Sequence, residues 1–447
     1  MPSKNIVVLG AGESGVGAAI LAKKKGYGVF VSDVGKIKEK YKNVLLQYEI
    51  NFEEGKHTTS LILQADEVIK SPGIPDKAAI ISAIEKKGIP VIDELEFAAR
   101  FTNAVKICIT GSNGKTTTTK LIYHILKNAG FNVGLGGNIG ESFALKVAEN
   151  DFDYYVLEVS SFQLDHMYDF KAEIAILTNI TPDHLDRYQY QFENYIQSKF
   201  RIIQNQTSND AFIYCDDDQT TIEHLDNYKT AAKKYSFSNL KTISGEGAYL
   251  KDKKIILTIN TKTITMEIET LALQGRHNIY NSMAAGVASK ILNVRKSIIK
   301  NSLANMENIE HRLEFIAKVH GIEFINDSKA TNVNSSWYAL ECMTKPTVWI
   351  VGGEDNGNDY TSLRQLAKSK VKAIVCLGID NSKIIQAFSD IVPIIIETIS
   401  AKAAVDNAYY LAESEDVVLL SPCCKSFDLF ENFEDRGIQF KNAVNEL

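Results

Sequence analysis

The chain has 447 residues, of which 45% are hydrophobic and 23% are charged. A chain of this length is too long to fold around a single hydrophobic core, and its apolar content excludes a disordered protein. We therefore expect several folded domains. The 49 lysines and arginines against 55 acidic residues give a net charge of −6, without a basic tract. That balance argues against nucleic acid as a partner and leaves small anionic ligands.

The sequence lacks the marks of a secreted or membrane protein. No stretch approaches the roughly 18 apolar residues of a membrane span, and the N-terminus leads into a strand-like run without a signal-peptide pattern. The six cysteines include no CxxC pair and match neither a disulfide framework nor a zinc site. We expect a cytoplasmic protein with reduced thiols and no membrane partner.

Short β-rich runs alternate with longer amphipathic helical runs along most of the chain, which predicts the α/β class with parallel sheets. The pattern starts at residue 5 and restarts at 105–121 and 321–332, which favours three domains. Residues 248–273 alternate and are rich in β-branched side chains, so we predict antiparallel hairpins there. The predicted domains are a Rossmann-like unit at 1–94, a central mononucleotide-binding unit containing those hairpins at 95–308, and a Rossmann-like unit at 309–447.

The first glycine motif, GAGESG at 10–15, lies between a predicted strand and a helix, and Asp33 closes the next strand. This arrangement is typical of a dinucleotide-binding fold. A glycine turn at a helix N-terminus accepts any diphosphate, so a nicotinamide or flavin cofactor, another nucleotide or simple packing all stay open. The turn SPGIP at 71–75 follows a later strand and is placed to face the same ligand.

A second glycine loop follows the strand at 105–110. Its sequence, TGSNGKTT, is two residues shorter than the common phosphate-loop pattern but keeps the backbone amides, a lysine for the phosphates and a hydroxyl for Mg²⁺. A loop without function is the alternative, and the strand context argues against it. We predict a nucleotide-phosphate site.

Three polar residues follow or accompany apolar runs near this loop. Glu158 ends a strand at the edge where a magnesium carboxylate belongs, although a surface or capping role is the alternative. His184 lies in a loop after another strand, where a structural histidine is more common than a ligand. Lys199 falls between apolar positions of a helix, on or beside its inward face. Burial lowers an amine's pKa and favours reaction with CO₂ to a carbamate, whereas a snorkelling lysine is the more common case.

Together these motifs, in this order over residues 5–440, resemble the Mur ligase family. The resemblance rests on TGSNGKTT (110–117), GGNIG (136–140), LEVSSFQL (157–164), TPDHLDRY (181–188), Lys199, GRHNIYN (275–281), HR (311–312), NDSKATN (326–332) and SPCCKSFDLFENFEDRG (421–437). It implies an ATP-dependent amide ligase of peptidoglycan precursor synthesis. The branch it most resembles adds D-glutamate to UDP-N-acetylmuramoyl-L-alanine through an acyl phosphate.

The resemblance also implies roles for individual residues. For ATP it implies Gly111, Ser112, Asn113, Gly114, Lys115, Thr116, Thr117, Asn278, Asn281, Arg312 and Asp327. For the UDP-sugar it implies Gly12, Glu13, Ser14, Asp33, Ser71, Pro72, Gly73, Asn138, Ser160, Gln163 and His184. For the incoming amino acid it implies Lys329, Thr331, Ser426, Phe427 and Phe433. The implied catalytic residues are Lys115, Asn138, Glu158, His184 and Lys199.

The cofactors implied are ATP and Mg²⁺ at two sites, one held by Thr116 and Glu158 and one by His184 and a carbamylated Lys199. The partners implied are the two small-molecule substrates, and we expect a monomer whose domains close on them. Two departures stand out. Asn356 replaces a lysine usual in this branch, which weakens one contact to D-glutamate, and Val34 after Asp33 leaves the uracil end to the backbone.

Three alternative functions stay open from the sequence. One is another Mur-type or polyglutamate-adding ligase, which the motifs at 326–332 and 421–437 disfavour. The second is a nicotinamide-dependent oxidoreductase built on the first glycine motif, and the third is a non-catalytic nucleotide-binding regulator. A phosphate loop with its own candidate metal ligands argues against the second, and an intact set of candidate catalytic residues argues against the third.

Overall fold

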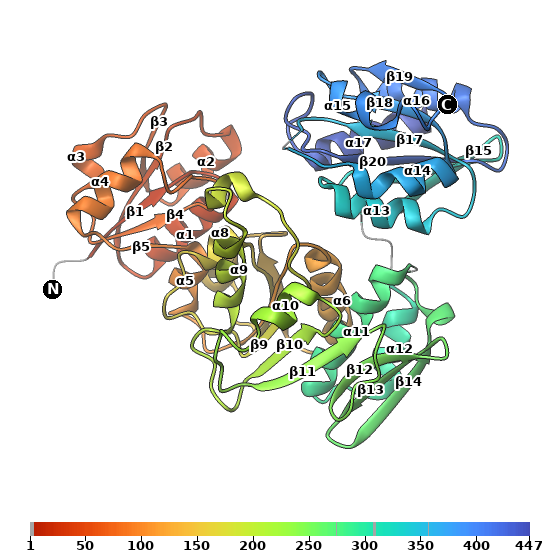
Figure 1. The fold of residues 1–447 in the computed structure, drawn as a ribbon. Helices are drawn as coiled ribbons and strands as arrows, with labels where there is room; N and C mark the ends of the chain where they lie inside the picture. The colour runs from red at the N-terminus through yellow and green to blue at the C-terminus, as the bar shows by residue number, and fades with distance from the viewer. Residues whose placement is uncertain (1–3, 274, 307–309, 356) are drawn as a thin grey trace. The chain divides into compact units, whose positions relative to one another are not determined.

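A computed structural model describes residues 4–273, 275–306, 310–355 and 357–447, and Figure 1 traces its elements. The chain divides into two compact units, one of residues up to 270 with 279–304 and the other of 271–278 with 305–447. The first unit carries two sheets and the second carries one. The predicted three-domain α/β architecture is confirmed, while the boundaries at 94 and 308 stay predictions.

The first sheet is parallel, with strand order β3-β2-β1-β4-β5. Alternate residues of β1 face opposite sides, so that Ile6 and Val8 pack with α1 while Val7 and Leu9 pack with α3 and α4. The order reverses at β1, which places a crevice at the end of that strand. The elements are β1 (Asn5–Leu9), α1 (Glu13–Lys24), β2 (Gly28–Asp33), α2 (Glu39–Gln47), β3 (Asn51–Glu54), α3 (Thr59–Ile62), β4 (Glu67–Lys70), α4 (Ala79–Lys87), β5 (Val91–Ile92) and α5 (Glu94–Ala99).

The second sheet has the order β14-β13-β12-β11-β10-β9-β6-β8-β7. The pairs from β7 to β12 are parallel, while β12, β13 and β14 pair antiparallel, so the predicted hairpins are confirmed at this edge. The strands are β6 (Val105–Thr110), β7 (Val133–Gly137), β8 (Tyr154–Glu158), β9 (Ile174–Leu177), β10 (Ala211–Cys215), β11 (Lys233–Ser238), β12 (Gly247–Lys251), β13 (Lys254–Ile259) and β14 (Lys262–Glu267). The helices are α6 (Lys115–Asn128), α7 (Phe143–Glu149), α8 (Ser161–Leu164), η1 (Leu185–Tyr188), α9 (Phe192–Phe200), η2 (Arg201–Ile203), α10 (Gln219–His224), η3 (Ile268–Thr270), α11 (Arg276–Ile291) and α12 (Lys296–Ala304).

The sheet of the second unit has the order β15-β16-β20-β17-β18-β19 and is parallel apart from the β15–β16 pair. Trp349 and Val351 of β17 face α13 to α15, while Val348 and Ile350 face α16 and α17. The elements are β15 (Glu314–Val319), β16 (Ile322–Asn326), α13 (Val333–Cys342), β17 (Thr347–Gly352), η4 (Thr361–Leu363), α14 (Arg364–Lys370), β18 (Val371–Leu377), α15 (Ser382–Phe388), β19 (Ile395–Thr398), α16 (Ala401–Leu411), β20 (Val417–Cys423) and α17 (Phe433–Asn445).

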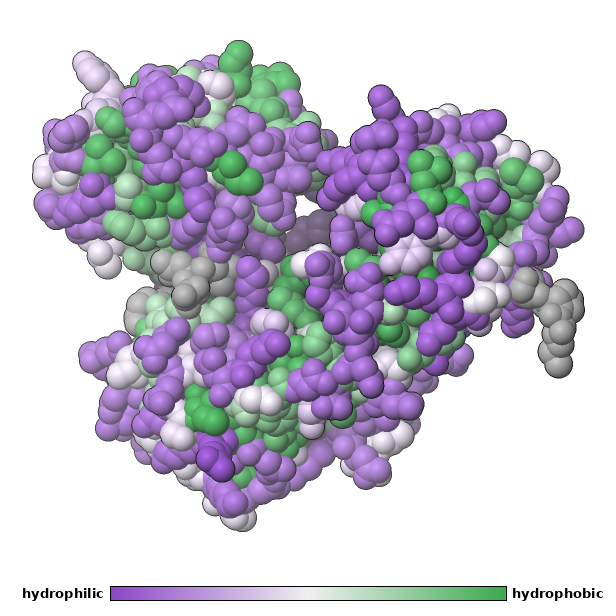
Figure 2. All heavy atoms as spheres, turned by 180° about the vertical axis from the view of Figure 1, so that it is seen from behind, coloured by the Kyte–Doolittle hydropathy of each residue, from purple (hydrophilic) through white to green (hydrophobic). Residues whose placement is uncertain are grey.

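The face of the molecule that Figure 2 draws is mainly polar. Figure 2 shows hydrophilic residues over most of the visible face, with hydrophobic residues in smaller groups between them. All six cysteines are free. Within the described ranges, no helix is both long and apolar enough to cross a bilayer.

Candidate functional site

The phosphate loop is a tight turn between β6 and α6 that requires glycine at two positions. Gly111 has a φ of +143° and Gly114, which precedes the first residue of α6, has a φ of +84°. A Cβ at Gly111 would collide with Thr178, and one at Gly114 would come within 2.5 Å of Asn281 Oδ1. The loop therefore brings backbone N–H groups to a helix N-terminus, which is an anion-binding arrangement.

The loop is held in shape by two residues that follow β9. Thr178 Oγ1 donates to the Asn113 carbonyl at 2.6 Å, and the Asn113 amide donates to Asn179 Oδ1 at 2.9 Å. Ser112 also donates its amide to the Asn179 carbonyl at 2.8 Å. Thr178 and Asn179 are not among the residues predicted from the sequence, although a polar pair directly after a buried strand is a usable signal.

Lys115 folds back over the loop that precedes it. Its Nζ donates to the carbonyls of Gly111 at 2.8 Å and Ser112 at 2.9 Å. These bonds hold a positive charge beside the loop amides. Thr117 is buried in the first turn of α6, and Thr118 Oγ1 donates to Asn281 Oδ1 at 3.2 Å.

Glu158 joins the ends of three elements. Its Oε2 accepts from Thr116 Oγ1 at 2.6 Å, and its Oε1 accepts from Asn138 Nδ2 at 2.9 Å. One carboxylate and one hydroxyl are hard oxygen donors suited to Mg²⁺, which usually takes its other ligands from phosphate and water. Among the described residues, no group of three or more His, Cys, Asp or Glu side chains is placed to hold a metal ion. The residues fit a Mg²⁺ that is bound together with a nucleotide.

Lys199 is 1% exposed, so its predicted inward position is confirmed. Its Nζ donates to Thr110 Oγ1 at 3.2 Å and lies 5.1 Å from the ring centroid of Tyr195. Burial, together with the charge of Lys115, moves the pKa of Lys199 well below its ordinary value, against the opposing charges of Asp183, Asp165 and Glu158. The side chain therefore lies in one electrostatic cluster with Lys115 and Glu158. Its carbamylation stays a prediction.

His184 lies at the start of η1 in a left-handed backbone conformation with a φ of +52°. Its ring meets that of Phe162 edge to face, with 5.2 Å between centroids. Its backbone amide donates to Asp183 Oδ1 at 2.9 Å, and Asp183 is one of the carboxylates that act on Lys199. The loop at 181–188 thus borders the cluster around Lys199.

The first glycine motif is ordered by Asp33. Its Oδ2 accepts from the Ala11 amide at 2.7 Å, and its Oδ1 accepts from the Gly35 amide at 2.7 Å. Gly12 precedes α1, whose first turn contains Glu13 and Ser14, and Tyr41 OH donates to Glu13 Oε2 at 2.8 Å. The motif therefore offers the amides of a helix N-terminus to an anion.

The remaining residues predicted for the UDP-sugar lie nearby in the first unit. Ser160 and Gln163 form a capping box at the start of α8, so their side chains engage each other. Ser71, Pro72 and Gly73 form the turn after β4, and the Ser71 hydroxyl lies beside Gly10. The structure thus brings together the turns at 10–14 and 71–73.

The residues predicted for the amino acid lie in the second unit, at the carboxyl ends of its parallel strands. Lys329 Nζ lies 4.9 Å from the ring centroid of Phe433, and Ser426 is buried after β20. Thr331 follows β16, whereas Phe427 is 65% exposed. Asn356, the position that departs from the branch pattern, lies outside the described residues.

The remaining residues predicted for the nucleotide are Asn278, Arg312 and Asp327. Asn278 is buried on α11. Burial raises the pKa of Asp327 to about 7 against the charge of Arg312, and the carboxylate accepts from Ser421 Oγ at 3.0 Å. Arg312 and Asp327 therefore act on each other within the second unit.

Arg436 was not predicted from the sequence. It is fully buried on α17 and donates to oxygens of Ser328, Gly352 and Cys424, which follow or end β16, β17 and β20. It therefore fixes the three loops that surround the predicted amino-acid residues.

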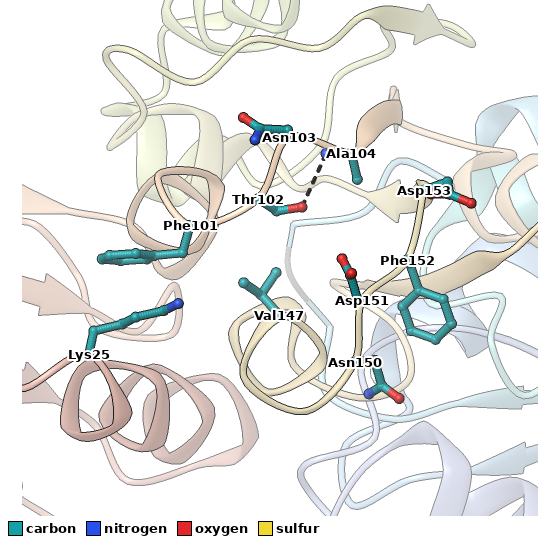
Figure 3. Close-up of a pocket in the computed structure, with 10 residues that line it drawn as sticks. All are labelled: Lys25, Phe101, Thr102, Asn103, Ala104, Val147, Asn150, Asp151, Phe152 and Asp153. Carbon is teal, nitrogen blue, oxygen red and sulfur yellow. Dashed lines mark hydrogen bonds between the residues drawn. The ribbon is translucent and has the colours of Figure 1, made fainter.

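A separate cavity of about 440 Å³ lies in the first unit between the ends of α1, α5 and α7 (Figure 3). Its lining includes Lys25, whose Nζ lies 5.3 Å from the ring centroid of Phe101, and the carboxylates of Asp151 and Asp153. None of the predicted site residues lines it. We do not assign this cavity to the site.

Comparison with known proteins agrees with this geometry. Residues 5–80 match the MurD N-terminal domain, residues 109–289 the Mur ligase middle domain, and residues 311–424 the Mur ligase glutamate ligase domain. Proteins named UDP-N-acetylmuramoylalanine--D-glutamate ligase are 56% identical in Bacteroides fragilis, over 99% of this chain and 100% of that protein, and 50% identical in Porphyromonas gingivalis, over 99% of both.

Solved structures share the fold at lower identity. A UDP-N-acetylmuramate-alanine ligase from Thermotoga maritima has a TM-score of 0.64 at 17% identity, over 99% of both chains. A pseudomurein peptide ligase from Methanothermus fervidus has a TM-score of 0.62 at 22% identity, over 99% of this chain and 100% of that one.

Proposed function

Because the chain belongs to the Mur ligase family, we propose that it adds D-glutamate to UDP-N-acetylmuramoyl-L-alanine with consumption of ATP, in peptidoglycan precursor synthesis. The observation that carries the proposal is the 50–56% identity, over 99% of the chain, with relatives named for this reaction. The oxidoreductase considered for the first glycine motif finds no support, because these full-length relatives are ligases. That motif is better assigned to the UDP diphosphate.

The phosphate loop is proposed to hold the ATP phosphates. A carboxylate oxygen of the sugar substrate attacks the γ-phosphorus, the bond to ADP breaks, and an acyl phosphate forms. Two anions must approach each other in this step, so Lys115 and the loop amides provide the positive potential that favours it. The two hydrogen bonds that Lys115 makes to its own loop are available for exchange with phosphate oxygens.

The second step uses the same cluster. The amine of D-glutamate attacks the acyl carbon, loses a proton, and phosphate leaves as the amide forms. Asn138 and His184 are proposed to hold the substrate carboxyl group, since Asn138 is already oriented by its bond to Glu158. The proposed amino-acid contacts are Lys329, Thr331, Ser426, Phe427 and Phe433.

Mg²⁺, when bound, would neutralise phosphate charge, with Thr116 and Glu158 as protein ligands at one site. A second site is proposed at His184 and a carbamylated Lys199. In carbamate formation the neutral amine attacks CO₂ and loses one proton, which converts a neutral side chain into an anion. The lowered pKa of Lys199 supports this proposal because only the unprotonated amine reacts.

Phosphate release from ATP tests the function. The assay contains UDP-N-acetylmuramoyl-L-alanine and one amino acid at a time, namely D-glutamate, L-glutamate, L-alanine or a diamino acid. We expect phosphate release with D-glutamate, and loss of that release by a hundredfold or more in Lys115→Ala, since one such transition-state group contributes about 3–4 kcal/mol. Preferential use of another amino acid would contradict the branch assignment. Phosphate release that persists in Lys115→Ala would contradict the phosphate site.

A further inference from the structure

The turn at residues 71–75 is held by an arginine from a different domain. Arg187, in the loop that carries His184, directs its guanidinium at three successive carbonyls of the turn. Its Nη2 donates to Pro72 O at 3.2 Å and to Ile74 O at 3.4 Å, and its Nη1 donates to Gly73 O at 3.5 Å. Both segments belong to the first compact unit.

These bonds fix which groups the turn presents on its other side. All described peptide bonds are trans, so the N–H of Gly73 points opposite to the Pro72 carbonyl and hence away from Arg187. The Ser71 side chain lies beside the first glycine motif, since a Cβ added to Gly10 would come within 2.6 Å of Ser71 Oγ. That hydroxyl is buried and makes no hydrogen bond within the described part of the chain. A buried hydroxyl without a partner beside a diphosphate-binding turn is suited to an anionic oxygen.

The same guanidinium also supports the catalytic loop. Its Cζ lies 4.4 Å from the ring centroid of Phe162, and that ring packs edge to face on His184. The Phe162 ring thus contacts both the Arg187 guanidinium and the His184 imidazole. These two contacts restrict the positions of all three side chains. Arg187 therefore contacts both the turn that faces the diphosphate and the aromatic ring that supports His184.

We propose that Arg187 is a positioning residue that aligns the turn at 71–75 with the His184 loop, so that binding of the UDP-sugar orders both parts of the site. This inference rests on the proposed function, because it assumes that the UDP-sugar binds beside these two segments. The bonds to the turn act on substrate affinity, whereas the stacking on Phe162 acts on turnover through His184.

Calorimetric titration with UDP-N-acetylmuramoyl-L-alanine, in the absence of ATP, tests the affinity component. We expect the Kd to rise about tenfold in Arg187→Met, because three carbonyl contacts are lost and the turn loosens. Arg187→Lys keeps the charge and one donor group, so we expect an intermediate Kd. Arg100→Met is the matched control, since both Nη atoms of Arg100 also donate to oxygens, those of the Glu67 carboxylate, and its Cζ lies 6.0 Å from the Phe97 ring centroid. We expect its Kd within twofold of wild type.

Steady-state kinetics separates the two components. Phe162→Leu should lower kcat while the Michaelis constant for the UDP-sugar stays within twofold, and Arg187→Met should change both. The Michaelis constant for ATP should stay within twofold in each variant. A wild-type Kd in Arg187→Met, or an equal rise in Kd in Arg100→Met, would overturn the inference. If Arg187→Met does not fold, the Kd of Arg187→Lys decides instead. A wild-type protein that neither binds nor converts the UDP-sugar would instead contradict the proposed function.

Discussion

Lys199 in the first compact unit and Arg436 in the second are both fully buried basic side chains, and the two differ in the number of their hydrogen-bond acceptors. Lys199 donates to a single hydroxyl, that of Thr110. Arg436 donates to oxygens on Ser328, Gly352 and Cys424, at distances of 2.9 to 3.5 Å. Burial lowers the pKa of both groups, to about 10 for Arg436 and well below its ordinary value for Lys199.

The two side chains differ in how many oxygen acceptors replace the water that each loses on burial. Arg436 stays protonated at neutral pH because carbonyl oxygens replace the water it loses. Lys199 has one acceptor and the repelling charge of Lys115, so its proton is held weakly. The same degree of burial therefore accompanies a hydrogen-bonded cation in one unit and an amine with a strongly lowered pKa in the other.

Replacing Arg436 should have the largest energetic effect of the changes considered. Arg436→Met leaves the carbonyls of three loops without their donor, and we expect the free energy of unfolding of the second unit to fall by about 3–5 kcal/mol. Arg436→Lys should restore part of this loss. Urea unfolding monitored by tryptophan fluorescence measures it, since both tryptophans, Trp337 and Trp349, lie in this unit. A loss below about 1 kcal/mol would show that the loops do not depend on the guanidinium.

Lys199→Arg tests the reactive amine. A guanidinium neither loses its proton nor forms a carbamate, so we expect phosphate release to fall by a hundred- to thousandfold, about 3–4 kcal/mol. Lys199→Met should lose the same activity while its melting temperature is retained, because a buried amine with one partner contributes little to stability. Full activity in Lys199→Arg would exclude the carbamate.

Glu94 extends the comparison to a buried acid. Burial raises the pKa of Glu94 to about 7, although its Oε1 accepts from Ser142 Oγ and the Ala144 amide. Between its ordinary pKa of 4.5 and about 7, the folded state keeps a proton that the unfolded state releases, so the free energy of unfolding falls as pH rises. We expect Glu94→Gln to remove about 2–3 kcal/mol of this decline, as measured by denaturation from pH 4.5 to 8. An unchanged slope would contradict the raised pKa.

Introducing a lysine at position 356 should have the smallest energetic effect of these changes. Asn356→Lys would replace a neutral hydrogen bond of about 1 kcal/mol by a charge-assisted one of about 1.5–3 kcal/mol. We expect the Michaelis constant for D-glutamate to fall severalfold while that for ATP is unchanged. If the D-glutamate constant does not change, residue 356 does not contact the amino acid.

The sequence predicts those site residues whose position follows from secondary structure alone. Gly111 to Thr116 and Glu158 follow or end apolar strands, and parallel strands place such residues at one edge of the sheet. The helical spacing around Lys199 likewise predicts its inward position. These predictions need only the hydrophobic periodicity of each helix or strand and the parallel direction of the strands in the sheet.

The residues that the sequence does not predict are defined by contacts between distant segments. Arg436 lies in a polar stretch that is typical of an exposed helix, and its burial depends on three loops more than ten residues away. Arg187 meets the turn at 71–75 only because two domains pack together. Thr178 and Asn179 directly follow a buried strand, which is a local signal, but the loop that they hold belongs to a neighbouring strand and cannot be identified from that signal.

Transfer of labelled oxygen tests the central claim most directly. UDP-N-acetylmuramoyl-L-alanine carrying ¹⁸O in its carboxylate is incubated with ATP and D-glutamate, and the released phosphate is analysed by mass spectrometry. If the carboxylate attacks the γ-phosphorus, each phosphate released during amide formation carries one oxygen from the sugar substrate. Unlabelled phosphate would show that ATP hydrolysis is separate from activation of the carboxylate, and would contradict the proposed ligase mechanism.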